Sequence, residues 1–424
     1  MASFSFRAGN ARKLRRIPLY LAGRLLTAVV PRTRGDWVFG CAVGVADGAL
    51  ALWRVAASHG ESGVWLVADA AQARRAAELG ISWVRKDSLR GLWLTARARV
   101  IVVTHGFGDV QRYAVAGAFI VQLWHGIPLK RIGLDSAETT RTGRGFAGAV
   151  LRRIVAALYR RTTRQICLLP ASSHLVRGRL ETAFALPDHR IPVTGEPRVD
   201  VLSQGLPEER RRTARTHLER ALGRPLGARR VVLYAPTWRD GEADPAVPDE
   251  GEWAAIAAAL ERLDGVLLVR SHPLGQGDYT PSLPTDRVAA LGSDRAADVT
   301  PLLAGVDVLV TDYSSLAFDA ALVPLPVLFF APDLEAYTAR RGLYGSYAAV
   351  AGTEPARTWS DVLARLAGIL DDPSSAVEAS RRRSEAVHAH RDGRNTDRVY
   401  REIRRRLDRA ESRSVRGDAG RVPR

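Results

Sequence analysis

Two series of short apolar runs limit what this chain can fold into more than any other feature. The first series comprises DWVFGCAVG, GVWLVAD, ARVIVVTHG and AFIVQLWHG, separated by helix-like stretches such as AQARRAAELG. The second comprises RRVVLYAPTW, GVLLVRSHP, VDVLVTDYSS and LPVLFFAPD. Continuous apolar strands that alternate with helices are typical of parallel sheets covered on both faces. The sequence therefore predicts an α/β protein with two doubly wound, Rossmann-like domains that face each other across a cleft.

The length of 424 residues agrees with two domains, because a single hydrophobic core stops growing beyond roughly 250–300 residues. A charged, proline-containing stretch separates the two series. We predict a basic amphipathic segment over 1–35, an N-terminal α/β domain over 36–205, a connector over 206–229, a C-terminal α/β domain over 230–403 and a basic tail over 404–424.

Composition points to a folded protein with an anionic partner. Hydrophobic residues make up 46% of the chain and charged residues 25%, which excludes wholesale disorder. The formal net charge of +17 favours a phosphate-bearing substrate, anionic lipid or nucleic acid, although a compositional bias toward arginine is an alternative. Cys41 and Cys167 are the two cysteines. Their wide spacing gives neither a disulfide framework nor a cysteine metal site, and it fits a reducing compartment.

Both ends of the chain are basic. The apolar stretch Ile17–Val30 is interrupted by Arg24 and is shorter than the ~20 residues that span a bilayer. It lacks the clean apolar core and cleavage site of a signal peptide. Two interpretations stay open: an amphipathic helix on an anionic membrane face, or an ordinary first helix packed on the core. The C-terminal end is predicted to be helical and then to fray into a solvated tail, with attraction to anionic lipid as the alternative.

Familiar cofactor motifs are missing or out of context. Gly143, Gly145 and Gly148 match G-x-G-x-x-G, but no strand precedes them, so we predict a flexible loop there. The sequence has no Walker loop, no D-x-D triplet and no histidine cluster with metal-ligand spacing. We therefore expect no metal site and no cofactor, while Mg²⁺ bound through a substrate pyrophosphate stays open.

Four strand ends carry polar residues: WHGIPLK, YAPTWRD, VRSHP and TDYSS. Any one of them reads as an ordinary turn. Ligands of open α/β sheets bind outside the carboxyl ends of the strands, so the four together favour one shared site.

The TDYSS segment predicts a phosphate site. A strand over Val306–Val310 is followed by Ser314 and Ser315, either of which can cap a helix over Leu316–Leu322. A capped helix N-terminus offers free N–H groups to phosphate, although a serine cap without ligand is the plain alternative. Asp319 is expected to complement the helix dipole or to accept substrate hydroxyls. We interpret Asp312 as a turn former.

The strand ends VRSHP and YAPTW add donors. Arg270 and His272 alternate along an extended segment and so share a side, where arginine suits phosphate oxygens and histidine can donate to a leaving group. Thr237 is a further candidate. Arg239 is a weaker one, because charged loop residues are usually solvated.

WHGIPLKR offers a base. The His125 imidazole can take a proton from an attacking hydroxyl, Gly126 lets a substrate approach, and Pro128 stiffens the loop. Lys130 and Arg131 would attract an anionic acceptor. His105, in VVTHGFGD, is an intermediate case that we interpret as structural.

At this point the sequence resembles a known family, the CDP-glycerol glycerophosphotransferases that build poly(glycerol phosphate) chains and primers of teichoic acid-type polymers. The matching segments are WHGIPLKRIGLD, SSHLV, TGEPRVDVL, LYAPTWRD, VRSHP, DVTPLLAGVDVLVTDYSSLAFD, RRGLYG and DGRNTDRVYREI, which cover most of Asp36–Ile403. The resemblance implies a glycosyltransferase-B-like fold, with an acceptor-side N-terminal domain and a C-terminal domain that holds the nucleotide. It also implies peripheral attachment to the cytoplasmic face of the cell membrane, without nucleic acid.

The resemblance further implies roles for individual residues. His125 would be the general base, and Arg270, Ser271 and His272 would lie at the pyrophosphate. The CDP-glycerol site would be lined by Arg198, Pro236, Thr237, Ser314, Ser315 and Asp319. An acceptor hydroxyl would attack the phosphorus next to glycerol and release CMP. The segment ADGALAL, around Asp47, departs from the family because it lacks an expected asparagine.

Three functions stay open at this point. The first is transfer of glycerol phosphate, or of another polyol phosphate such as ribitol phosphate, to a lipid-linked acceptor. The second is sugar transfer from a nucleotide-sugar donor on the same fold. The third is a nonenzymatic binder of anionic polymer, for which the net charge is the sole support. The sequence gives neither the acceptor nor the oligomeric state.

Overall fold

A computed structural model describes residues 17–33, 35–140, 145–239, 243–271, 275, 277–281, 285–352 and 354–419. The predicted site residue His272 lies outside these residues. So do Gly143 of the rejected glycine motif, residues 1–16 and 34 of the predicted N-terminal segment, and residues 420–424 of the predicted tail.

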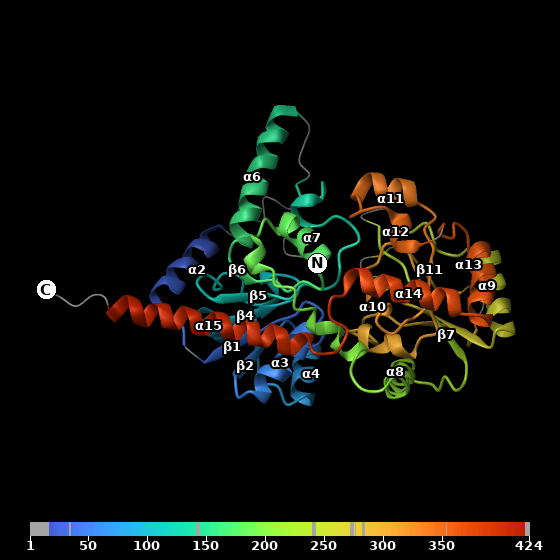
Figure 1. Cartoon of the computed structure of the whole chain (residues 1–424), viewed down its shortest axis with the longest axis horizontal. Helices are drawn as coiled ribbons and strands as arrows, with labels where there is room; N and C mark the ends of the chain where they lie inside the picture. Colours follow the sequence, from blue (N-terminus) through green and yellow to red (C-terminus); the bar gives the residue numbers. More distant parts are fainter. Residues whose placement is uncertain are drawn as a thin grey trace.

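Two parallel sheets form the frame of the molecule (Figure 1). The six-stranded sheet has the order β3-β2-β1-β4-β5-β6, and the five-stranded sheet has the order β11-β10-β7-β8-β9. The strands are β1 (Asp36–Phe39), β2 (Ser62–Val67), β3 (Trp83–Arg85), β4 (Val100–Val103), β5 (Phe119–Gln122), β6 (Ile166–Leu168), β7 (Arg230–Ala235), β8 (Gly265–Val269), β9 (Val288–Ala290), β10 (Val308–Thr311) and β11 (Val327–Phe329). All eight apolar runs contain a strand, and the predicted fold class is confirmed.

Helices cover the sheets. They are α2 (Ile17–Val29), α3 (Asp47–Ser58), α4 (Ala70–Glu78), α5 (Leu89–Arg97), α6 (Gly145–Thr163), α7 (His174–Phe184), α8 (Pro207–Leu222), α9 (Glu250–Arg262), α10 (Leu316–Ala320), α11 (Leu334–Arg341), α12 (Tyr347–Ala351), α13 (Trp359–Asp371), α14 (Ser374–Val387) and α15 (Asn395–Ala419). Short 3-10 helices are η1 (Phe107–Asp109), η2 (Gly133–Asp135), η3 (Asp188–Arg190), η4 (Pro197–Leu202) and η5 (Thr300–Gly305).

Both faces of each sheet are buried. In β1, Val38 joins one apolar cluster while its neighbours Trp37 and Phe39 join the cluster on the opposite face. In β7, Val231 and Val232 divide between two clusters in the same way. Because successive side chains of a strand point to opposite faces, continuous apolar runs are what a two-sided core requires.

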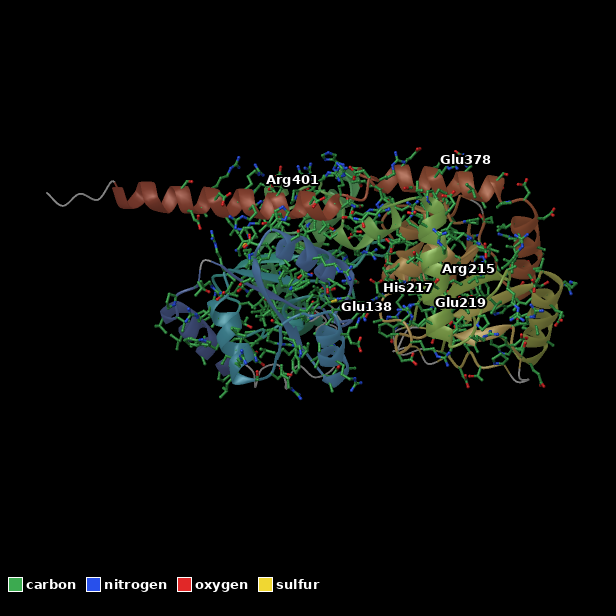
Figure 2. All side chains as sticks on the ribbon, turned by 90° about the horizontal axis from the view of Figure 1, so that it is seen from below. Glu138, Arg215, His217, Glu219, Glu378 and Arg401 are labelled. Atoms are coloured by element: carbon green, nitrogen blue, oxygen red, sulfur yellow. The ribbon has the colours of Figure 1, made fainter. Side chains whose placement is uncertain are left out.

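The last helix returns to the first domain. Figure 1 shows α14 and α15 running one after the other along both halves, and Figure 2 shows Glu378 of α14 and Arg401 of α15 beside different halves. Val399 and Ile403 are buried in the core of the N-terminal half, and Arg404 pairs with Glu61 at 3.0 Å. We predicted a C-terminal domain up to residue 403 and a basic tail over 404–424, in an end of the chain that is helical and then frays. Helix α15 extends to Ala419, and it packs on the N-terminal half.

The predicted connector 206–229 is also largely helical. Helix α8 packs on the C-terminal half through the buried Leu218, and Arg215 pairs with Asp307 at 3.0 Å (Figure 2). The flexible loop predicted around the glycine motif is wrong for Gly145 and Gly148, which lie in α6. Small residues did not prevent a helix there, because the rest of α6 has few strong helix breakers.

Helix α2 packs on the core along one side only. A Cβ on Gly23 would lie 2.0 Å from the Tyr113 carbonyl oxygen, and the Tyr20 and Tyr113 rings meet edge to face at 4.8 Å. Leu25 and Val29 on the other side are 71% and 78% exposed. Among the residues that the structure describes, no helix combines the length and the apolar character needed to cross a membrane.

Candidate active site

Two histidines stack where β4 and β5 end. The strands pair in parallel, with Val103 opposite Gln122, so the residues that follow them emerge side by side. The rings of His105 and His125 are 4.2 Å apart and 3° from parallel. His125 therefore has a partner ring that the sequence analysis assigned to structure alone.

The backbone around His125 is held in an uncommon conformation. Trp124 has a φ of 65° and Gly126 a φ of 132°. The indole of Trp124 is buried and meets Phe184 edge to face at 5.0 Å, which fixes the strained residue in the core. A bulky residue with positive φ costs of order 1–3 kcal/mol and is found mainly at functional sites.

The His125 imidazole is neutral. Burial, followed by the neighbouring His105, holds its pKa well below the ordinary value, and a hydrogen bond with the Thr104 backbone opposes the shift. The His125 Nδ1 atom is covered and has no hydrogen-bond partner. Because Nδ1 has no partner, we assign the bond with the Thr104 carbonyl, and the ring proton, to Nε2, which leaves a lone pair on Nδ1.

Gly126 lies in close contact with the C-terminal half. A Cβ at this position would lie 2.6 Å from Ser315 Oγ and 3.3 Å from Arg198 Nη2. Only a glycine fits this contact at its φ of 132°. The structure therefore brings the WHG and TDYSS segments together, as expected of strand ends that share a site.

Arg198 is the centre of a buried charge cluster. Its Nη2 donates to Asp319 Oδ1 at 2.5 Å, its Nε lies 3.6 Å from Glu196 Oε2, and its Nη1 is 3.4 Å from Thr300 Oγ1. Burial opposes the charge, but the carboxylates raise the pKa of Arg198 above its ordinary value. Asp319 thus binds an arginine of the other half, and it lies in the first turn of α10, where a carboxylate complements the helix dipole. Its use for substrate hydroxyls stays a prediction.

Asp47 joins this cluster from the start of α3. Its φ is 60°, and burial raises the pKa of its carboxyl to about 7 against the opposing effect of Arg198. Burial likewise raises the pKa of Glu196 to about 7. One arginine cannot balance three carboxylates, so this cluster takes up a proton near neutral pH.

The strand ends of the C-terminal half are satisfied internally. Asp312 accepts from the Thr237 backbone N–H at 2.9 Å and from Arg239 Nη1 at 2.9 Å, which ties β7 to β10. Arg239 also binds both oxygens of Asp333 at 2.8 Å. We expected Arg239 to be solvated, but these two carboxylates and the faces of Tyr313 and Tyr337 bury it.

Arg270 holds a loop. Its guanidinium donates to the carbonyls of Leu291, Ala296 and Ala297 at 3.1, 2.8 and 3.3 Å. Most of the N–H groups of this guanidinium therefore bind carbonyls of the chain itself. Ser271 follows at the end of β8 and is half-buried, and Pro236 is buried at the end of β7.

The serines of TDYSS form a weaker cap than we predicted. Ser314 Oγ accepts from the Leu316 N–H at 3.2 Å, whereas Ser315 makes no side-chain capping bond. Helix α10 ends at Ala320 rather than Leu322. A helix this short has a small dipole. At a phosphate site here, the hydroxyls and N–H groups of the turn would therefore contribute more to binding than the helix dipole.

The loop after His125 bridges both halves. Lys130 pairs with Leu343 in an antiparallel β-bridge, and the Arg131 N–H donates to the Gly342 carbonyl at 3.0 Å. The Pro128 carbonyl accepts from Arg179 at 2.8 Å. The segments PLKR and RRGLYG, far apart in sequence, are thus one structural unit.

A cavity of about 170 Å³ lies beside this bridge in the C-terminal half. It is lined by Trp238, Arg239, Asp333, Ala336, Tyr337, Arg340 and Arg341. Arg340 also lies 3.9 Å from Glu138 of the N-terminal half, a residue labelled in Figure 2. Aromatic faces and guanidinium groups in one cavity suit a planar or phosphate-bearing ligand.

Three further residues lie beside His125 and Arg198 and were not assigned to a site from the sequence: His105, Asp47 and Glu196. His105 follows its strand as His125 follows the next one, a parallel that could have identified it. Within the described part of the chain, no group of three or more His, Cys, Asp or Glu side chains is arranged to hold a metal ion. The expectation of no metal and no cofactor stays a prediction.

The comparison with solved structures identifies the type of fold. The wall teichoic acid polymerase TagF superimposes with a TM-score of 0.72 at 21% identity, over 95% of this chain and 97% of that one. The fold is therefore glycosyltransferase-B-like.

The family follows from the sequence. The model of the CDP-glycerol:poly(glycerophosphate) glycerophosphotransferase family matches residues 44–405, so the chain belongs to this family. It is 30% identical over 277 residues to the teichoic acid glycerol-phosphate transferase of Staphylococcus aureus strain NCTC 8325, covering 63% of this chain and 66% of that protein. It is 29% identical over 227 residues to the teichoic acid ribitol-phosphate primase of Bacillus spizizenii strain W23, covering 51% and 54%. The chain thus spans about half to two thirds of these relatives.

Proposed function

We propose that the protein transfers glycerol phosphate, or a related polyol phosphate, from a CDP-linked donor to a hydroxyl of a membrane-linked polymer or primer. The observation that carries this proposal is the neutral His125 with a free lone pair on Nδ1, close to where Gly126 meets Ser315. Family membership supports the donor class.

In the proposed reaction the acceptor oxygen bonds to the phosphorus next to the polyol, and the bond from that phosphorus to CMP breaks. The acceptor proton passes to His125 Nδ1, and CMP leaves with the electron pair. Because Nδ1 is covered, neighbouring groups must move apart before the hydroxyl reaches it. A neutral imidazole can accept this proton throughout the physiological pH range.

The donor would lie on the C-terminal side of the cleft. Ser314 and Ser315 offer hydroxyl groups after β10, and Thr237 lies beside them after β7, where it binds Asp312. Arg270, Ser271 and His272 follow β8, where they would face the pyrophosphate and the departing CMP. Lys130 and Arg131 would steer the anionic acceptor from the opposite side. Mg²⁺, if required, would come with the pyrophosphate.

Ribitol phosphate is the second candidate for the transferred group, because a relative named as a ribitol-phosphate primase aligns nearly as well as one named as a glycerol-phosphate transferase. A donor screen decides. The protein is incubated with a lipid-linked acceptor in vesicles and with CDP-glycerol, CDP-ribitol or a UDP-sugar, and CMP or UDP release is measured. CMP release that depends on acceptor supports the proposal. UDP release without CMP release makes the protein a nucleotide-sugar transferase instead, and release of neither nucleotide also overturns the proposal.

We further propose that α2 and α6 place the protein on the anionic, cytoplasmic face of the cell membrane. In Figure 1, α6 extends away from the rest of the N-terminal half. Leu151, Ile154 and Leu158 form one exposed stripe on α6 by their spacing, while Val155 and Tyr159 turn inward. Arg152, Arg153, Arg160 and Arg161 are exposed on the same helix. An apolar stripe flanked by arginines suits the interface of an anionic bilayer.

Vesicle sedimentation tests this placement. We expect the protein to bind vesicles that contain phosphatidylglycerol and to bind phosphatidylcholine vesicles weakly. Ile154→Glu should weaken binding at least fivefold, whereas Leu175→Glu, an exposed leucine on α7 (52% exposed), should leave it unchanged. Equal binding of both variants would contradict the placement on α6.

A further inference from the structure

We propose that His105 is a positioning residue for the proposed reaction: its ring, stacked on His125, fixes the plane of the base and keeps it free of a second proton. This inference rests on the proposed function, in which His125 is the base. It goes further because it makes the two histidines one unit instead of a base and a structural neighbour.

The rings of His105 and His125 lie face to face. The ring centroids are 4.2 Å apart and the planes differ by 3°, so the two rings are in contact over their faces. Trp124 lies on the chain beside them, 4.1 Å from His125 and tilted by 36°. His125 is therefore confined by an aromatic ring on each of two sides, and the ring that lies parallel to it is His105.

His105 is itself held in place by its neighbours. Asp109 of η1 accepts from the His105 backbone N–H at 2.7 Å and from the Thr104 N–H at 2.9 Å. The Thr104 hydroxyl lies 2.8 Å from His105 Nδ1 and 3.1 Å from Cys41 Sγ. The hydroxyl thus contacts the His105 ring itself, and the carboxylate fixes the backbone of the turn that carries this ring.

The charge of one imidazole affects protonation of the other. Two imidazoles in face contact cannot both be protonated at moderate pH. Burial lowers the pKa of His105 to about 4, so near neutral pH both rings are uncharged. As the pH falls, a proton on His105 delays protonation of His125. The other charged groups that face the pair are Arg198, which also opposes protonation, and Asp109 behind His105. The carboxylates of Glu196, Asp319 and Asp47 are turned to Arg198.

Two substitutions separate position from charge. In His105→Ala the ring is lost, so we expect kcat for CMP release to fall at least tenfold while the KM for CDP-glycerol stays within twofold. In His105→Phe a flat ring remains but cannot be protonated. The logarithm of kcat for this variant should lie at least halfway from the value of His105→Ala to that of the wild type. The acid limb of its pH profile should move up by at least half a pH unit, because His125 then takes the first proton.

His189→Phe is the matched control, since this histidine is exposed on η3. Thermal unfolding shows which variants are folded. If His105→Ala does not fold, the acid limb of His105→Phe decides alone. The inference is overturned if that limb coincides with the wild-type limb, or if a folded His105→Ala keeps the wild-type kcat. A wild-type protein that releases no CMP from any CDP-polyol overturns the proposed function instead, so the two failures are distinguishable.

Discussion

The two halves of the molecule both present the carboxyl ends of their strands to the site, but the residues there differ. In the N-terminal half, Trp124 is strained, His125 has an unpartnered nitrogen, and two imidazoles are kept neutral by burial. In the C-terminal half, Arg239 and Asp312 satisfy each other and their neighbours. In the proposed function, the first half carries the reactive group while the second is a rigid support.

The largest expected effect is on the reactive side. His125→Asn removes the base, and general-base catalysis contributes about 10²–10⁴-fold to a rate, so we expect CMP release to fall by this factor. Thermal unfolding shows whether the variant is folded, because asparagine removes Nε2 and the ring that stacks on His105. His189→Asn is the control and should keep full activity. A His125→Asn rate within threefold of wild type would contradict the assignment of the base.

In the C-terminal half, which we interpret as the rigid support, a substitution should lower the free energy of unfolding. Arg239→Met leaves Asp312 and Asp333 without their cation, and breaking a buried pair costs about 3–5 kcal/mol of the free energy of unfolding. Urea denaturation measures this loss. Arg382→Met removes an exposed pair with Glu378 and should cost less than about 1 kcal/mol. Similar costs for both variants would show that the C-terminal half is less rigid than we infer.

The charge cluster between the halves predicts a pH dependence. The pKa of Glu196 is raised from 4.5 to about 7 in the folded protein, so the folded state binds the extra proton between these values. Its contribution to stability is full below pH 4.5 and is lost as the pH rises to 7. The Glu196→Gln variant has no carboxyl group at this position, so its stability does not fall with pH for this reason. From pH 4.5 to 7.5 its free energy of unfolding should rise relative to wild type by about 1–3 kcal/mol.

Chemical denaturation of both proteins at several pH values makes this comparison. Glu208→Gln is a control, because Glu208 is exposed in the first turn of α8. A constant difference between Glu196→Gln and wild type across the range would contradict a protonated Glu196.

The smallest effect is expected where the halves touch. Gly126→Ala adds a Cβ 2.6 Å from Ser315 Oγ, at a φ of 132° that alanine tolerates poorly. We expect a drop in kcat of about tenfold, since small displacements of reacting groups are costly. Gly178→Ala, in the middle of α7 with nothing near its Cβ, should keep its activity and gain up to about 1 kcal/mol of stability. Full activity of Gly126→Ala would show that the contact does not position His125.

The sequence predicts the frame of this protein well, because apolar runs mark central strands and ligand sites follow strand ends. The strands it misses, β3, β6 and β9, have three residues each and lie at sheet edges, where a short apolar run is hard to recognise. The return of α15 to the N-terminal half depends on tertiary contacts such as Tyr400 with Glu61. No local pattern encodes such a contact.

The site is predictable in part for the same reason. His125, Gly126 and Ser315 were identified from turns that follow strands, and the structure brings them together. The burial of Arg239 depends on Asp312 and Asp333, which are 73 and 94 residues away in sequence. Arg198 and Asp319 are 121 residues apart. Pairing between distant charges cannot be inferred from either segment alone.

The central claim is that His125 is a neutral base whose Nδ1 is free to accept a proton. Nitrogen-15 NMR of the histidine-labelled protein tests it most directly, with His125→Asn used to assign the signal. We predict a neutral ring at pH 6 with its proton on Nε2, and no titration near the ordinary histidine pKa of about 6.5. A ring that is protonated at pH 6, or that carries its proton on Nδ1, would contradict the account.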